Sequence, residues 1–111
     1  MSKLIELCDK YEATGKKMGW KIDRTLLEKV AKGCGPSIYR KDASLVAASD
    51  KKELERVKKN FLIKKLGMKD TPKLDEAIAT VCTDFKGVRQ KPRALFYYRL
   101  VVNLRKKAMY N

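Results

Sequence analysis

The stretch PRALFYYRLVVNLRKKAMY, residues 92–110, decides the fold. Pro92 can open a helix, because its ring holds φ near the helical value and its missing N–H is not needed there. At about 100° per residue, the apolar side chains cover well over half of the helix circumference; they are Leu95, Tyr97, Tyr98, Leu100, Val101, Val102 and Leu104. A helix with so wide an apolar arc needs neighbours on most sides. The stretch therefore predicts a central helix.

Three further segments have helical start signals and apolar stripes. Ser2 and Asp23 are placed as N-caps, and Thr71 followed by Pro72 marks a third start, with Gly87 as its end. The predicted inward stripes are Leu4, Leu7, Cys8 and Tyr11 in the first segment, Leu26, Leu27, Val30 and Ala31 in the second, and Leu74, Ala77, Ile78, Val81, Cys82 and Phe85 in the third. Apolar residues at i, i+3, i+4 and i+7 are typical of amphipathic helices.

The segment between these helices adds one long helix and one short one. Asp50 and Glu53 have the spacing of a capping box, and Gly67 is a natural helix stop. Asp42 is placed to cap a short helical piece that carries Leu45. Because strand patterns are absent and the connections are short, we expect an all-α fold: a compact orthogonal bundle of about five helices plus a short helical piece, in one domain, residues 1–111.

Two lysines in the predicted helix of residues 50–67 lie within its apolar arc. With Leu54 at zero on a helical wheel, Lys58 and Lys65 fall near 40° and 20°. The favoured interpretation is that their stems run along a cleft between two neighbouring helices, with their ammonium groups in water. The alternative is a cationic seam that binds a phosphate or a carboxylate.

Positive charge is concentrated near the end of the chain. The sequence has 27 Lys and Arg against 13 Asp and Glu, a net charge of +14, and residues 86–111 contain eight basic residues and no acidic one. On the predicted central helix Phe96 falls among the cations, an arrangement that suits stacking and phosphate contact with single-stranded nucleic acid. The candidate nucleic-acid contacts are Arg89, Lys91, Arg93, Phe96, Arg99, Lys106 and Lys107. Alternatively, Phe96 is covered and the cations only keep the protein soluble.

The chain lacks residues that many catalytic sites require. There is no histidine, and the three cysteines, Cys8, Cys34 and Cys82, are far apart. A Ser-His-Asp or Cys-His site is excluded and a zinc site is unfavourable, so we expect no enzyme, no metal and no cofactor. Cys34, between two glycines, is placed like an exposed nucleophile, although packing against its own helix is the favoured interpretation. Sparse thiols suit a reducing cytoplasm, and no apolar run approaches the ~20 residues of a membrane span.

Two segments carry a family resemblance. GCGPSIYRKDASLVAASDKKELERVKKNFLIKKLGMKD (residues 33–70) and RALFYYRLV (residues 93–101) resemble the small bacterial proteins of the domain-of-unknown-function family 2853. The resemblance extends over essentially the whole chain. It implies a soluble, single-domain bacterial protein, and it supplies no activity, ligand or functional residue.

The sequence favours a non-catalytic binding module as the function. Its expected partner is nucleic acid, held mainly by phosphates and without strong sequence preference. The alternative is a protein-interaction or scaffold module whose basic face docks an acidic protein. Such a module would expose an apolar patch, for which Ile38 and Tyr39 are the candidates.

Overall fold

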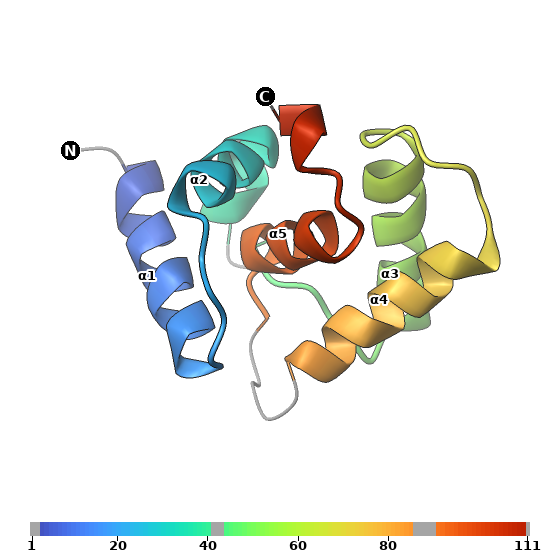
Figure 1. The fold of residues 1–111 in the computed structure, drawn as a ribbon, viewed down its shortest axis with the longest axis horizontal. Coiled ribbons are helices and arrows are strands. Elements are labelled where there is room, and N and C mark those ends of the chain that lie inside the picture. The colour runs from blue at the N-terminus through green and yellow to red at the C-terminus, as the bar shows by residue number, and fades with distance from the viewer. Residues whose placement is uncertain (1–2, 41–43, 86–90, 111) are drawn as a thin grey trace.

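The computed structural model describes residues 3–40, 44–85 and 91–110 (Figure 1). Five α-helices form its framework: α1 (Lys3–Lys17), α2 (Arg24–Gly33), α3 (Lys51–Arg56), α4 (Pro72–Asp84) and α5 (Arg93–Asn103). Three helical elements of other types accompany them: the 3₁₀ helices η1 (Gly35–Tyr39) and η3 (Lys107–Tyr110), and the π-helix η2 (Val57–Ile63). Within the described residues, extended pairing is limited to one antiparallel bridge between Leu45 and Pro92. The fold is all-α, as predicted.

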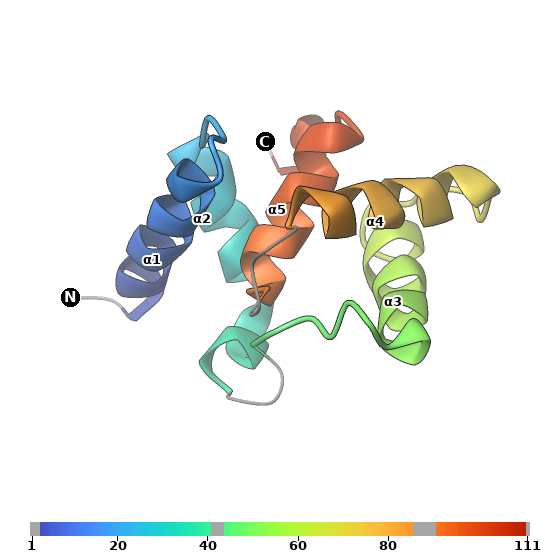
Figure 2. The same cartoon turned by 90° about the horizontal axis from the view of Figure 1, so that it is seen from below.

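Helix α5 is the centre of the bundle. In Figures 1 and 2, α1 and α2 lie on one side of it and α3 and α4 on the other. Its buried residues are Ala94, Leu95, Phe96, Tyr98, Leu100 and Val101. The prediction of a central helix from its wide apolar arc is therefore confirmed. The radius of gyration, 12.9 Å, agrees with about 13 Å for a compact domain of this size.

The predicted apolar stripes form the core around α5. The whole predicted stripe of α2 is buried, as are Cys8 and Tyr11 of α1 and Leu74 and Ile78 of α4. The stripe residues that are only partly buried against this core are Leu4, Leu7, Ala77 and Cys82. Ser2 and Gly87, the predicted first cap and the predicted end of α4, lie outside the described residues. No helix in the described parts of the chain has both the length and the apolarity of a membrane span.

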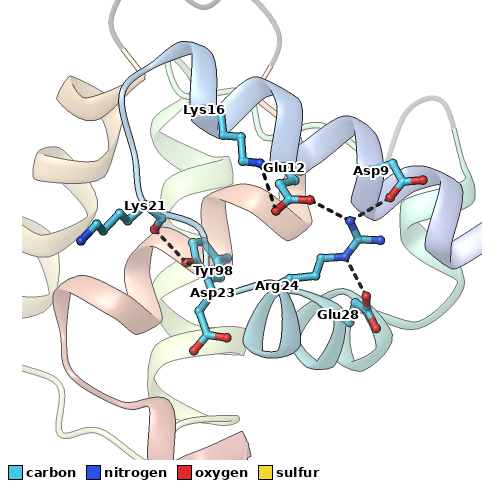
Figure 3. A network of polar contacts seen from close by, with 8 residues as sticks. All are labelled: Asp9, Glu12, Lys16, Lys21, Asp23, Arg24, Glu28 and Tyr98. Carbon is cyan, nitrogen blue, oxygen red and sulfur yellow. Dashed lines mark hydrogen bonds and ion pairs between the residues drawn. The ribbon is translucent and has the colours of Figure 1, made fainter.

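An arginine on α2 fixes α1 against it (Figure 3). Arg24 Nη1 lies 2.8 Å from Asp9 Oδ1 and 3.0 Å from Glu12 Oε1, both on α1. Its Nε donates to Glu28 on α2 at 2.7 Å, and Lys16 lies 3.7 Å from Glu12. These side chains are partly exposed, so each pair contributes modestly. The cluster links α1 to α2, while the buried Cys8 and Tyr11 pack α1 into the core.

Asp23 connects the start of α2 to both α5 and the end of the chain. Its carboxylate accepts from Leu26 N at 3.2 Å as the predicted N-cap, and its Oδ2 lies 2.6 Å from Lys107 Nζ. Its backbone N–H donates to the Tyr98 hydroxyl at 2.8 Å, and that hydroxyl donates to the Lys21 carbonyl at 3.5 Å. The N-cap therefore also anchors η3, the last helical element.

These contacts predict a pH dependence of stability. The hydrogen bond from Lys107, followed by that from Leu26 N, lowers the pKa of Asp23. A carboxyl whose folded pKa is depressed stabilises the fold above its unfolded pKa of about 3.9. This contribution is lost as the pH falls through the folded pKa. Because Asn also caps helices well, Asp23→Asn should cost only the ion pair, about 0.2–1 kcal/mol at pH 7.

The measurement is the melting temperature between pH 6 and pH 2.5. The fall on acidification should be smaller in Asp23→Asn than in the unmodified protein. Glu76→Gln, which changes an exposed carboxylate on α4, is the control and should keep the full fall. Equal falls in all three proteins would contradict the role of Asp23.

The short helical piece lies elsewhere than predicted. Asp42 is outside the described residues, but Leu45 and its neighbours are not helical. Arg93 N donates to the Ser44 carbonyl at 2.7 Å and Val46 N to the Lys91 carbonyl at 2.8 Å. These bonds hold the segment extended along the start of α5, which prevents helix formation there. The 3₁₀ turn forms earlier, at η1, where Pro36 favours the first helical position.

Helix α3 begins at the predicted N-cap and then changes type, but the predicted capping box does not form, because Asp50 N donates to the Ala47 carbonyl at 3.0 Å and the Glu53 carboxylate pairs with Arg93. Lys52 N donates to Asp50 Oδ1 at 2.9 Å, and Gly67, with φ of 68°, lies where the helix was expected to stop. From Val57 onward the backbone is π-helical, with a bond from Lys64 N to the Lys59 carbonyl at 3.1 Å. A helical wheel at 100° per residue is therefore wrong beyond α3, and so are the angles that it gave the side chains.

Candidate functional site

Phe96 does not lie on an outward face, so the predicted stacking platform is wrong. Its side chain is 0% exposed, and its ring is stacked on that of Phe85 with centroids 5.7 Å apart. Phe85 follows the end of α4, and Trp20 packs edge-on against it at 5.1 Å. Because α4 and the segment after α1 cover this side of α5, the polar wedge of the helix is narrower than the sequence suggested.

The predicted cations of this flank have different neighbours. Arg93 Nη2 lies 2.6 Å from Glu53, Arg99 Nε lies 3.0 Å from Asp84, and Lys107 lies 2.6 Å from Asp23. Arg99 also lies 4.4 Å from the centroid of the Trp20 ring. Each of these three charges is thus compensated locally by a carboxylate from another part of the fold.

The remaining predicted contacts do not restore a continuous basic track. Lys91 and Lys106 are both partly buried, one before α5 and one after it. Arg89 lies outside the described residues. Among the described candidates, the structure therefore brings none of the predicted phosphate contacts together around an exposed aromatic ring.

Lys58 and Lys65, the two lysines of the predicted cationic seam, contact different neighbours and do not form one site. Lys58 of η2 lies 2.9 Å from Asp70 and 3.2 Å from Asp75. Its ammonium group therefore connects η2 to the start of α4. Lys65 lies instead over the Tyr110 ring, 5.9 Å from its centroid. The π-helical backbone between them, with its wider turn, turns the two side chains toward different neighbours.

Lys65 and Arg93 meet at a cavity that sequence patterns did not predict. The cavity has a volume of about 340 Å³ and lies between α2, η2 and α5, with η1 and η3 contributing to its border. Its lining residues are Val30, Gly33, Cys34, Ser37, Asn60, Phe61, Lys65, Arg93, Tyr97 and Tyr110. Such a volume is at the low end of the range for small-molecule sites.

Arg93 is held rigidly at the side of this cavity. Its Nη1 donates to the Tyr97 hydroxyl at 3.0 Å, and its Nη2 donates to Glu53 at 2.6 Å and to the Leu45 carbonyl at 3.3 Å. The Tyr97 ring is in turn stacked on Phe61, with centroids 4.0 Å apart. The guanidinium and both rings are therefore fixed before any ligand arrives.

The hydroxyl and thiol groups of the cavity are neutral at physiological pH. Burial raises the pKa of Tyr110 to about 12 and the pKa of Cys34 to about 12. Burial also raises the pKa of Tyr97, although the neighbouring Arg93 opposes the shift. These groups keep their protons and act as hydrogen-bond donors. Cys34 is thus a protonated thiol in the cavity, not a thiolate nucleophile at neutral pH.

Sequence reasoning found part of this cavity. It singled out Cys34, Lys65 and Arg93, but it missed Asn60 and Tyr110. Asn60 lies in the π-helix, which periodicity does not reveal. Tyr110 lies in η3, beyond the end of the helix to which the sequence assigned it. No pattern in the sequence brings residues from five elements to one cavity.

Comparison with known proteins places the chain in a family. Residues 10–108 match the family described as "Protein of unknown function (DUF2853)", and no curated protein matches. The matched residues include α2, η2 and α5 and every residue that lines the cavity except Tyr110. Because the match extends over far more than half of its length, the chain belongs to the DUF2853 family.

Proposed function

We propose that the protein is a non-catalytic binding module that holds a small organic anion in the cavity between α2, η2 and α5. The observation that supports this most directly is the composition of its lining. Lys65, Arg93, Asn60 and two tyrosines bring hydrogen-bond donors to one small volume, and none of the described lining residues is acidic. A few converging polar groups on otherwise apolar walls are typical of ligand sites.

The π-helix provides independent support. Seven residues of π-helix, Val57–Ile63, are an unusual length for a rare backbone form that occurs frequently at functional sites. This element supplies Asn60 and Phe61 to the cavity, and Lys65 follows directly after it. An irregular backbone at the place where a cavity forms is more simply explained by binding than by stability.

The side chains at the site favour binding over catalysis. The candidate nucleophile, Cys34, carries a thiol whose pKa burial raises to about 12. The chain has no histidine to act as its base. Of the described residues, no group of three Cys, Asp or Glu side chains is placed to hold a metal ion.

The test is calorimetric titration of the full chain with small carboxylates and phosphate esters near pH 7. Lys65→Met should weaken anion binding about tenfold or more, because a hydrogen bond to a charged group is worth about 1.5–3 kcal/mol. Lys64→Met is the matched control: it removes the neighbouring exposed charge, which does not line the cavity. Equal loss in both variants, or no binding by the unmodified protein, would contradict the proposal.

Nucleic acid is a second candidate, favoured by the net charge of +14. Even with the ion pairs described above, cations outnumber carboxylates by two to one, and an excess of this kind attracts phosphates. Lys29 and Lys107 line a surface hollow together with Tyr110 and Asp23. Because Asp23 compensates Lys107, Lys29 is the cation that supports a phosphate contact there.

Titration with short single-stranded DNA and RNA at several salt concentrations separates this candidate from the first. Phosphate-directed binding should weaken steeply with salt and should survive Lys65→Met almost unchanged. If neither DNA nor RNA binds at low salt, an acidic protein becomes the candidate partner for the excess positive charge. A pull-down with the Tyr39→Ala variant would then examine the exposed Tyr39, whose neighbour Ile38 is buried.

A further inference from the structure

We propose that the ligand of the cavity is an aromatic monocarboxylate, a flat ring system that carries one negative charge. This inference rests on the proposed function and names the chemical class that the cavity accepts. It follows from three properties of the lining residues: their net charge, the protonation of their hydroxyl groups, and the aromatic rings among them.

The cavity has one uncompensated positive charge. Two cations line it, but Arg93 is compensated by Glu53 at 2.6 Å, a carboxylate that also lies 3.3 Å from Arg56 outside the lining. Lys65 has no described carboxylate within ion-pair distance, and its ammonium group lies 5.9 Å from the centroid of the Tyr110 ring. One carboxylate would balance the remaining charge. A phosphate dianion carries one negative charge more than this lysine balances.

The neutral polar groups complement the carboxylate oxygens. The Tyr97 hydroxyl accepts from Arg93 at 3.0 Å, so its own proton is directed elsewhere and is available to an acceptor. Asn60 of η2 and Tyr110 of η3 also line the cavity, and their side chains carry an amide and a hydroxyl donor. A carboxylate can accept up to about four hydrogen bonds, which matches such a set.

The remaining lining surface suits a flat ring. The rings of Phe61, Tyr97 and Tyr110 come from η2, α5 and η3, and Val30 adds an aliphatic contact. The first two are stacked with an interplanar angle of 14°, so they form one rigid aromatic unit. A volume of about 340 Å³ lies at the low end of the range for small-molecule sites, and one ring or two fused rings with a carboxylate fit within it.

The experiment compares probes that differ in one property each, by calorimetric titration of the full chain near pH 7. Benzoate and indole-3-acetate represent the proposed class. Hexanoate keeps the charge without the ring, benzamide keeps the ring without the charge, and phenyl phosphate keeps the ring with a second charge. We expect hexanoate to bind about three- to tenfold more weakly than benzoate and benzamide about tenfold more weakly or worse.

The outcomes distinguish failure of this inference from failure of the proposed function. If hexanoate binds as tightly as benzoate, or phenyl phosphate binds about tenfold more tightly, the assigned class is wrong while anion binding stands. If none of the four anions binds, the proposed function itself fails. Tighter binding of benzoate and indole-3-acetate than of the other three probes supports both.

A variant at the end of the chain tests the role of the ring with little risk to folding. Tyr110→Leu should lower the ratio of benzoate to hexanoate affinity toward one, because the aromatic contact is lost and the charge is kept. Tyr39→Leu is the matched control, since Tyr39 is a half-exposed tyrosine that does not line the cavity. An unchanged ratio in Tyr110→Leu would overturn the aromatic part of the inference.

Discussion

Replacing Phe96 by alanine should lower the free energy of unfolding by about 3–5 kcal/mol, the usual cost of removing a buried phenylalanine. Phe96 is 0% exposed at the centre of the bundle, and its ring is stacked on Phe85, which is equally buried. Removing either ring leaves a cavity that α4 and α5 cannot close without moving. Phe85→Ala should therefore have an effect of similar size, whereas the outward position that the sequence suggested for Phe96 would imply a much smaller cost there.

Denaturant unfolding followed by the fluorescence of Trp20, the single tryptophan, measures both costs. Trp20 lies against Phe85, so its signal reports directly on this part of the core. Because the two rings are in contact, the double variant should cost less than the sum of the single ones. Val102→Ala, on the exposed side of α5, is the control and should change stability little. A small loss in Phe96→Ala would place its ring at the surface.

The fold could be predicted from the sequence because its signals are local. Caps such as Asp23, stops such as Gly67 and stripes of period 3.6 depend only on neighbouring residues, and the structure contains them where they were expected. The central position of α5 also followed, since a helix with a wide apolar arc must be surrounded. The unusual backbone of η2 could not be predicted, because a wheel at 100° per residue assumes an α-helix and seven residues are too few to reveal a different period.

The candidate site could not be predicted because it depends on tertiary neighbours. Counting the cations on one helical wheel suggested a basic flank, but carboxylates from distant segments compensate three of these cations. The pairs are Arg93 with Glu53, Arg99 with Asp84, and Lys107 with Asp23. The sequence gives the number of charges and not their partners. Phe96 was misassigned for the same reason: a wheel shows the angle of a side chain and not whether another helix covers it.

Replacing Glu53 by glutamine should lower the free energy of unfolding by about 1.5–3 kcal/mol, the range for hydrogen bonds to charged groups. Glu53 lies in α3 and its carboxylate is 2.6 Å from Arg93 at the start of α5, forty residues away. Both side chains are largely buried, 13% and 16% exposed. The loss should fall below the 3–5 kcal/mol of a fully buried pair, because water still reaches both groups.

Glu55→Gln supplies the control, since the same chemical change removes an exposed pair with Lys59 and should cost less than about 1 kcal/mol. The two variants also differ at the cavity. Glu53→Gln removes one negative charge beside Arg93, so the net charge around the lining rises by one and phenyl phosphate should gain affinity relative to benzoate. Glu55→Gln should leave that ratio unchanged, because Glu55 contacts neither the cavity nor Arg93. A ratio that moves equally in both variants would mean that general surface charge, and not the pairing of Arg93, sets the preference.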